Sequence, residues 1–92
     1  MNKGMMKCKL GDMVLSKNGK YDGEIFIVYK LIDNEFCYIV NGKQRKLCNP
    51  KKKKVKHLLK ICENADLEQK LQNNAYILDS DIAKIISKYK NK

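Results

Sequence analysis

The longest apolar run in the chain is EIFIVYKLI, residues 24–32, and it restricts the fold more than any other segment. The run is short for a helix, and it is rich in the β-branched and aromatic residues that favour strands. Shorter runs of the same kind stand on either side of it, DMVLS at 12–16 and FCYIV at 36–40. Glycine, asparagine and aspartate separate the runs, as is typical of turns. The sequence therefore predicts a series of short strands.

Asn41-Gly42 follows FCYIV directly and is the strongest short signal for a hairpin turn. We therefore predict that KQRKLC, residues 43–48, forms the return strand and that VKHLLKI, residues 55–61, forms a fifth strand. Short strands with tight turns favour a small closed barrel over an open sheet, because closure removes exposed strand edges. The expected fold class is mainly β, with a five-stranded barrel over residues 7–62.

The rest of the chain, residues 63–92, has the spacing of two short helices. In the first, Asn64 is placed to cap the helix, and Leu67 and Leu71 fall on one face. The second, DSDIAKIISKYK at 79–90, has lysines in its last turn. We expect both helices to form an appendage packed on the barrel, although the apolar stripe of the second would also suit binding to a partner protein. That stripe consists of Ile82, Ile85, Ile86 and Tyr89.

The positive charge of the chain is concentrated in its first two thirds. The net charge is +10, and residues 1–62 carry 15 lysines and arginines against 5 acids, whereas residues 63–92 carry 5 against 5. Such asymmetry indicates a binding surface for a polyanion, nucleic acid first and an acidic membrane surface second. No apolar run approaches the roughly 18 residues that span a bilayer. The start, MNKGMMKCKLGD, lacks the apolar segment of a secretory signal, so we expect a cytoplasmic protein without a membrane partner.

The four cysteines, Cys8, Cys37, Cys48 and Cys62, do not have the spacing of a metal site. Structural zinc sites usually take their ligands as close pairs, and no two of these cysteines stand in a CxxC arrangement. Disulfides are disfavoured in a reducing cytoplasm. We therefore predict small buried hydrophobes in or beside strands, with no metal and no cofactor.

Two basic segments are candidates for binding. In NPKKKKVKHLLK, residues 49–60, Pro50 ends the preceding strand, and the lysines that follow are expected to form a loop held at both ends. In the second segment, residues 11–33, glycines surround a strand, a basic loop and another strand. Gly19 and Gly23 would let this loop turn with positive φ, so that lysines project from it beside Tyr21, a candidate stacking surface for a base.

This second segment, GDMVLSKNGKYDGEIFIVYKLID, resembles a KOW motif, with Gly11, Gly19 and Gly23 as its glycines and Gly23 at the position of the KOW glycine. Together with NPKKKKVKHL, it is similar to bacterial KOW-domain RNA-binding proteins related to the large-subunit ribosomal protein fourteen-e of archaea and eukaryotes. The resemblance implies an SH3-like barrel and binding to RNA, commonly ribosomal RNA. The members of that family usually carry longer basic extensions, whereas this chain ends in a neutral helical segment.

The expected function is therefore RNA binding by contacts between lysines and phosphates, which position a protein without reading the base sequence. Arg45, the only arginine, has the planar fork that suits a bidentate phosphate contact. The alternative is a protein-interaction module of the transcription or translation machinery. We expect no enzyme, because no acid–base, nucleophile or phosphate-loop pattern appears, and the oligomeric state is left open. The predicted RNA-binding residues are Lys17, Lys20, Tyr21, Lys43, Arg45, Lys51, Lys52, Lys53, Lys54, Lys56 and His57.

Two further expectations are geometric. The lysines of residues 51–54 should share one face of the molecule with the loop that carries Lys17 and Lys20. Tyr29, Tyr38 and Tyr76 are expected to pack in the core or at its edge rather than to serve as stacking surfaces.

Overall fold

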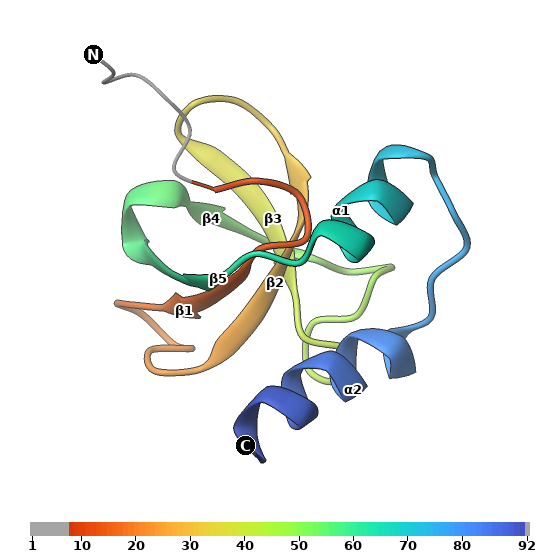
Figure 1. Ribbon diagram of the computed structural model, residues 1–92. Helices are drawn as coiled ribbons and strands as arrows, with labels where there is room; N and C mark the ends of the chain where they lie inside the picture. Colours follow the sequence, from red (N-terminus) through yellow and green to blue (C-terminus); the bar gives the residue numbers. More distant parts are fainter. Residues whose placement is uncertain (1–7, 92) are drawn as a thin grey trace.

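The computed structural model describes residues 8–91. Two predictions concern residues outside this range. The predicted barrel begins at position 7, and most of the amino-terminal segment that we expect not to be a secretory signal lies before position 8. Within residues 8–91, five strands are followed by two helices (Figure 1), and a 3₁₀ turn, Val55–His57, links the last two strands. The elements are β1 (Met13–Ser16), β2 (Ile25–Leu31), β3 (Phe36–Val40), β4 (Lys51–Lys54), β5 (Leu58–Cys62), α1 (Ala65–Gln72) and α2 (Asp79–Lys90).

The strands form one antiparallel sheet in the order β4-β3-β2-β1-β5. The mainly β class and the carboxy-terminal helices are confirmed, but the prediction of a closed barrel is wrong. β4 pairs with β3 and β5 pairs with β1, and no pairing joins the two, so β4 and β5 remain the edges of the sheet that the structure describes. The 3₁₀ turn connects these edges along the chain without hydrogen-bonding them to each other as strands.

Apolar side chains cover both faces of the sheet. On one face lies the inner core, enclosed by the sheet and its loops; on the other lies the helix-side core, where α1 and α2 pack. Successive residues of a strand alternate between them, so that Phe26 and Val28 belong to the inner core and Ile27 to the helix-side core. The inner core comprises Cys8, Val14, Tyr21, Phe26, Val28, Cys37, Ile39, Val55 and Leu58. The helix-side core comprises Met13, Ile27, Val40, Leu67, Ile82 and Ile86.

The chain between β3 and β4 is a long loop rather than a two-residue turn. Asn41 does not adopt positive φ, as the tightest Asn-Gly hairpin turn would require, although Gly42 does, at +79°. Instead, the Asn41 side-chain carbonyl oxygen accepts hydrogen bonds from the backbone N–H groups of Lys43 and Arg45, both at 3.0 Å. The predicted return strand at 43–48 is therefore absent, and the strand that pairs with β3 begins only at residue 51.

Two more predictions change for the same segment. The lysines of residues 51–54 form β4 and not a loop, because each of them pairs with a residue of β3. VKHLLKI is not a single strand, since the 3₁₀ turn takes up its first three residues and β5 begins at Leu58. Pro50 stands immediately before β4, outside the sheet, where its missing N–H does not interrupt the pairing.

Both helices form as predicted and pack on the sheet. The Asn64 side chain accepts a hydrogen bond from the Leu67 N–H at 3.0 Å and so caps α1. At α2, an Asp79 carboxylate oxygen accepts from the Leu47 N–H at 2.6 Å, which ties the β3–β4 loop to the start of this helix. Gly42 permits the close approach, since an added Cβ would collide with the Asp79 carbonyl oxygen. Of the predicted stripe, Ile82 and Ile86 are buried, whereas Tyr89 is 40% exposed.

The helices are short and amphipathic. Within residues 8–91, no helix has the length and apolar character that crossing a membrane would need.

Candidate nucleic-acid interface

Strand β4 consists entirely of lysines and lies at an edge of the sheet. Its register with β3 decides which way each lysine points, because residues directly opposite in an antiparallel pair lie on the same face. Lys51 and Lys53 are opposite Ile39 and Cys37 and therefore share the side of the inner core. Lys52 and Lys54 are opposite Tyr38 and Phe36, on the other side. The strand thus presents two lysines on each face.

The lysine strand meets the basic loop between β1 and β2. The Lys53 ammonium donates a hydrogen bond to the Asn18 carbonyl oxygen at 2.9 Å. The Lys17 N–H in turn donates to the His57 carbonyl oxygen at 2.9 Å, which joins the same loop to the 3₁₀ turn. The predicted proximity of the two lysine groups is confirmed at Lys53. It does not extend to Lys52 and Lys54, because the strand alternation turns these to the opposite face.

The pKa of His57 is affected by the positive charges of this region. Partial burial, followed by the positive charges of the nearby lysines, lowers the pKa of His57 from its usual 6.5. An imidazole with a lowered pKa is neutral at physiological pH, so it adds no charge to its cationic surroundings. The lysines that contribute are Lys56, Lys53, Lys54 and Lys17.

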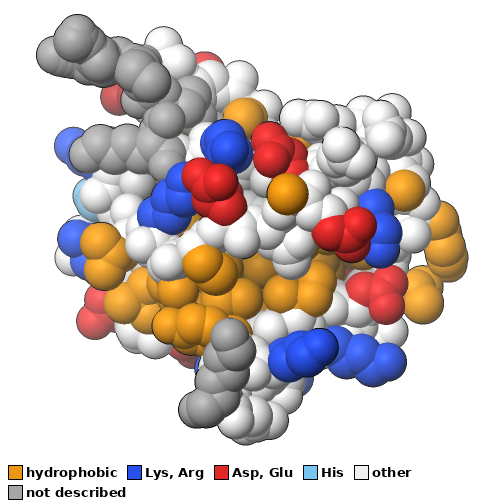
Figure 2. Space-filling view, in the orientation of Figure 1, with side chains coloured by type: hydrophobic (Ala, Val, Ile, Leu, Met, Phe, Trp, Pro, Cys, Tyr) orange, Lys and Arg blue, Asp and Glu red, His pale blue; other side chains and the backbone are white. Residues whose placement is uncertain are grey.

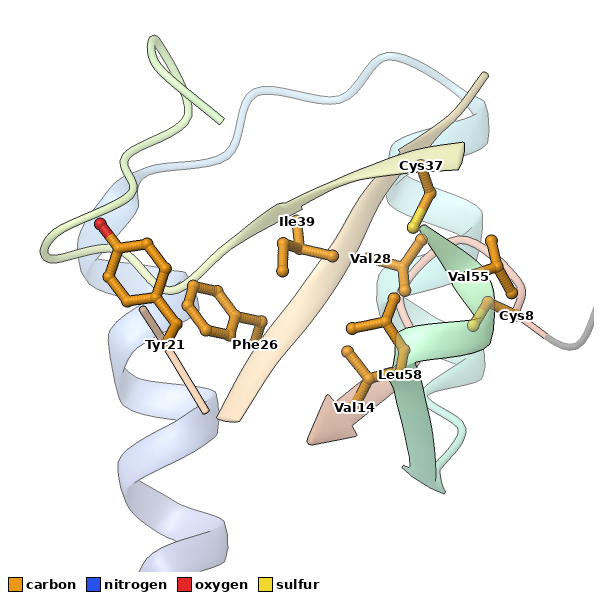
Figure 3. Close-up of a cluster of buried hydrophobic side chains, with 9 residues drawn as sticks. All are labelled: Cys8, Val14, Tyr21, Phe26, Val28, Cys37, Ile39, Val55 and Leu58. Carbon is orange, nitrogen blue, oxygen red and sulfur yellow. The ribbon is translucent and has the colours of Figure 1, made fainter. Parts of the chain in front are cut away.

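Tyr21 does not provide the predicted stacking surface. It is only 9% exposed, and its ring lies edge-on to Phe26 within the inner core, with centroids 5.5 Å apart (Figure 3). Two cations lie near this ring, the Lys20 ammonium at 5.7 Å and the Arg45 guanidinium at 5.8 Å from its centroid. Tyr21 therefore anchors the basic loop in the inner core, and its ring lies within cation–π distance of Lys20 and Arg45.

Phe36, an aromatic residue that is not among the predicted binding residues, lies beside two lysines of β4. The Lys52 and Lys54 ammonium groups are 4.7 and 6.0 Å from the centroid of its ring, and the side chain is half-buried. The charge of Lys52 also acts on a carboxylate, that of Asp33. Hydrogen bonds from the Glu35 and Phe36 N–H groups, and then the charge of Lys52, lower its pKa. Phe36 could be assigned to this site only from its pairing with Lys54 in the sheet, and that pairing could not be predicted without β4.

Two of the predicted residues, Tyr21 and Lys43, do not lie with the others, and two more, Lys52 and Lys54, lie on the opposite face of β4 from Lys53. Lys43 lies beside Glu24, Gln44 and the carboxy-terminal part of α2, in a depression away from the lysine strand. Gly19 and Gly23 have the predicted positive φ, at +83° and +86°, and they frame the basic loop, whereas Gly11 packs against α1. We call the following set, which includes both faces of the edge strand β4, the basic surface: Lys17, Lys20, Arg45, Lys51, Lys52, Lys53, Lys54, Lys56 and His57.

The exposed tyrosine was also misassigned. Tyr76 is 88% exposed and so is not a core residue, while Tyr29 and Tyr38 are half-buried as predicted.

The cysteines divide into two pairs by burial. Cys8 and Cys37 are buried in the inner core as predicted, and burial raises the pKa of Cys37 to about 12. Its thiol therefore stays protonated and is a poor nucleophile. Cys48 and Cys62 are exposed, contrary to the prediction. Among residues 8–91, no three histidine, cysteine, aspartate or glutamate side chains come together as potential metal ligands.

The basic surface thus combines a lysine edge strand, the 3₁₀ turn that directly follows it and a glycine-framed basic loop that lies far from both in the sequence. Comparison with protein-family models finds no family that matches this chain, and comparison with curated proteins finds no matching relative.

Proposed function

We propose that this chain is a cytoplasmic RNA-binding module of the SH3-like KOW kind. Its basic surface docks on the phosphates of folded RNA, with ribosomal RNA as the first candidate. The observation that carries the proposal is the contact between the Lys53 ammonium and the Asn18 carbonyl oxygen, because it places the inner face of the lysine strand next to the basic loop. Lysines on several segments of a rigid fold can neutralise several phosphates at once.

The order of elements supports the SH3-like part of the proposal. Five antiparallel strands with a 3₁₀ turn between the last two, and Gly23 after a basic loop between the first two, suit such a fold. Among the described residues, Gly23 has no neighbour within 4 Å of the place where a Cβ would stand, so its φ of +86° is the physical reason for glycine there.

The distribution of aromatic and planar groups suits RNA rather than a simple anion. Phe36 lies directly under two lysine ammonium groups, so a nucleotide that pairs its phosphate with these lysines brings its base near this ring. Arg45 is half-buried, and the carbon of its planar guanidinium lies 5.8 Å from the centroid of the Tyr21 ring in the basic loop. Stacking on such groups is one of the main ways in which unpaired bases are bound.

A lysine edge strand also has a purely structural use, since charged side chains on an edge discourage pairing with the edge of another sheet. The two roles predict different behaviour. If the lysines serve only to protect the edge, their neutralisation promotes aggregation and leaves the RNA affinity unchanged. If they bind phosphates, their neutralisation lowers the affinity in a salt-dependent way.

The experiment compares two variants in which the same amount of charge is removed. The first replaces Lys51, Lys52, Lys53 and Lys54 by glutamine; the second replaces Lys70, Lys84, Lys88 and Lys90, which lie on the helices, by glutamine. Affinity for ribosomal RNA fragments is measured by filter binding at several salt concentrations. For the natural chain, contacts with about six phosphates predict a loss of about a thousandfold or more between 50 and 200 mM salt.

The strand variant should bind much more weakly, and the slope of its salt dependence should decrease by about one unit for each lysine–phosphate pair that the substitutions remove. The helix variant should retain most of the affinity. Equal reductions of affinity in the two variants, or an affinity nearly independent of salt, would contradict the proposal. Crosslinking in cells, followed by sequencing of the bound RNA, then identifies the target against a charge-matched control protein.

A further inference from the structure

A groove runs between the two helices, on the side of the molecule where the helix-side core lies. Its volume is about 620 Å³, and α1, α2 and the segment that joins them line it. Figure 2 shows hydrophobic side chains in a band across this face, which runs from the region of β1 to the space between α1 and α2. The apolar residues of the groove are Leu67, Tyr76, Ile77 and Ile85.

Tyr76 is the most exposed large apolar residue that the structure describes, at 88%. It lies on the segment between the helices, and it also lines a second depression next to the groove, with Leu47 and Leu71. Because the Tyr76 side chain is so little buried, it contributes little to the stability of the folded chain. Tyrosine is, however, enriched in interfaces between proteins. The groove thus has an apolar floor and is lined by an exposed aromatic side chain that a bound partner could contact.

The charges at the rim of the groove are not balanced. Asp66 is paired with Lys70 at 3.4 Å, and Asp81 accepts a hydrogen bond from the Leu78 N–H at 3.0 Å at the start of α2. Lys84 and Lys88 also line the groove, and no ion pair joins either of them to another residue within 8–91. They stand four residues apart on one helix face, where two like charges repel each other.

From this charge pattern we infer that the groove docks an acidic amphipathic helix of a partner protein. An apolar stripe on the occupant fills the floor at Leu67 and Ile85, and carboxylates beside the stripe pair with Lys84 and Lys88. Helix-in-groove binding of this kind uses apolar anchors at spacings of three and four residues. Desolvated carboxylates would also relieve the repulsion between the two lysines.

A second copy of this chain suits the groove less well. The net charge of each copy is +10, so two copies repel each other as a whole. A two-fold symmetric dimer would moreover bring together two grooves that each carry three lysines against two aspartates, so the excess positive charge of one groove would meet that of the other. An acidic partner meets neither obstacle.

The inferred groove site is separate from the basic surface. None of the residues of the basic surface lines the groove, and the helices that form it follow the sheet in the chain. The inference therefore goes beyond RNA binding and does not depend on it: the molecule would hold an acidic protein helix at one place and a polyanion at another, as an adaptor.

The experiment selects peptides on the full chain from a displayed library of random peptides of about 16 residues, long enough for about four helical turns. Enriched peptides should carry an apolar helical stripe flanked by acidic residues. Their affinity for the chain is then measured by fluorescence anisotropy. It should fall about tenfold or more in the double variant Lys84→Glu, Lys88→Glu and in Tyr76→Ser.

Two controls make the result specific. Lys90→Glu reverses the charge of a lysine that lies on the same helix but does not line the groove. This variant should leave peptide affinity unchanged. Glutamine at Lys51, Lys52, Lys53 and Lys54 should also leave it unchanged, while lowering RNA affinity, so the two proposals fail independently. All altered positions are exposed or half-buried, and thermal unfolding verifies that each variant is folded.

Three outcomes would overturn the inference. The enriched peptides show no acidic amphipathic pattern; or they bind the groove variants as tightly as the natural chain; or the chain dimerises in sedimentation experiments and Tyr76→Ser abolishes the dimer, which would assign the groove to a second copy.

Discussion

The two faces of the sheet bury similar side chains but are completed in different ways. The inner core is closed by elements of the first two thirds of the chain, including the 3₁₀ turn and the loop that carries Tyr21. The helix-side core depends on α1 and α2, which contribute Leu67, Ile82 and Ile86. The same strands thus serve two cores, one formed largely by the sheet itself and one that needs the carboxy-terminal segment.

This comparison explains why EIFIVYKLI is continuously apolar. A strand with one buried face shows alternation of apolar and polar residues, whereas a strand buried on both faces does not. Phe26 and Val28 enter the inner core and Ile27 enters the helix-side core. The faces also differ in what surrounds them: Lys51 and Lys53 and the basic loop lie on the inner side, and the groove lies between the helices.

Phe26→Ala should have the largest effect on stability, because Phe26 is fully buried in the inner core and packs against Tyr21. Removing a buried phenylalanine side chain typically costs about 3–5 kcal/mol of unfolding free energy, a large part of the stability of a small domain. Chemical denaturation measures this cost. A cost below about 1 kcal/mol would mean that the inner core is not the main source of stability.

Ile82→Ala makes the equivalent change in the helix-side core, where Ile82 is 1% exposed. We expect the unfolding free energy to fall by about 2–5 kcal/mol, with Lys84→Ala on the same helix as a control of little effect. Amide hydrogen exchange then distinguishes two cases. If the two cores unfold as one unit, protection falls equally in α2 and in β2; a decrease confined to α2 would make the helices a separately unfolding part.

Gly42→Ala probes the contact between the β3–β4 loop and α2. Gly42 and Gly23 both have positive φ, but of these two only Gly42 is placed so that a Cβ would collide with another element, at the Asp79 carbonyl oxygen. An alanine at either position would be strained by the positive φ, at a cost of the order of 1 kcal/mol. Gly23→Ala measures this strain alone, because a Cβ there has no neighbour within 4 Å in the described part of the chain. Gly42→Ala should cost about 1–3 kcal/mol more in denaturation experiments. Equal costs would show that α2 moves away without penalty.

The smallest effect concerns His57, on the inner side of the molecule. Partial burial and the surrounding lysines lower its pKa in the folded chain, so the unfolded chain binds a proton at higher pH than the folded chain does. The contribution to stability is present above the usual pKa of about 6.5 and is lost as pH falls through the lowered value. A histidine NMR titration should show this lowered pKa.

High salt, or glutamine at Lys53 and Lys54, should move the pKa of His57 back toward its usual value, because both weaken the positive field. Bound RNA should raise it as well, by adding negative charge. A pKa at or above the usual value in the free protein would contradict the electrostatics of the basic surface.

The strands that could be predicted are those with apolar runs, and β3 was predicted to the residue. The strand that could not be predicted is β4. Lysine has a low preference for strands, so four consecutive lysines resemble a loop when they are seen alone. They form a strand because β3 offers an unpaired edge and the β3–β4 loop, tied to α2 through Asp79, delivers the chain to it.

The sequence by itself determined the mainly β fold, the two helices and the concentration of positive charge before residue 63, since these depend on local pattern and composition. Only the tertiary structure decided that the sheet stays open, that Tyr21 is a core residue, and that Phe36 lies among the lysines. The physical reason is that pairing register and loop length fix which side chains share a face. Both are set by contacts between segments far apart in the chain.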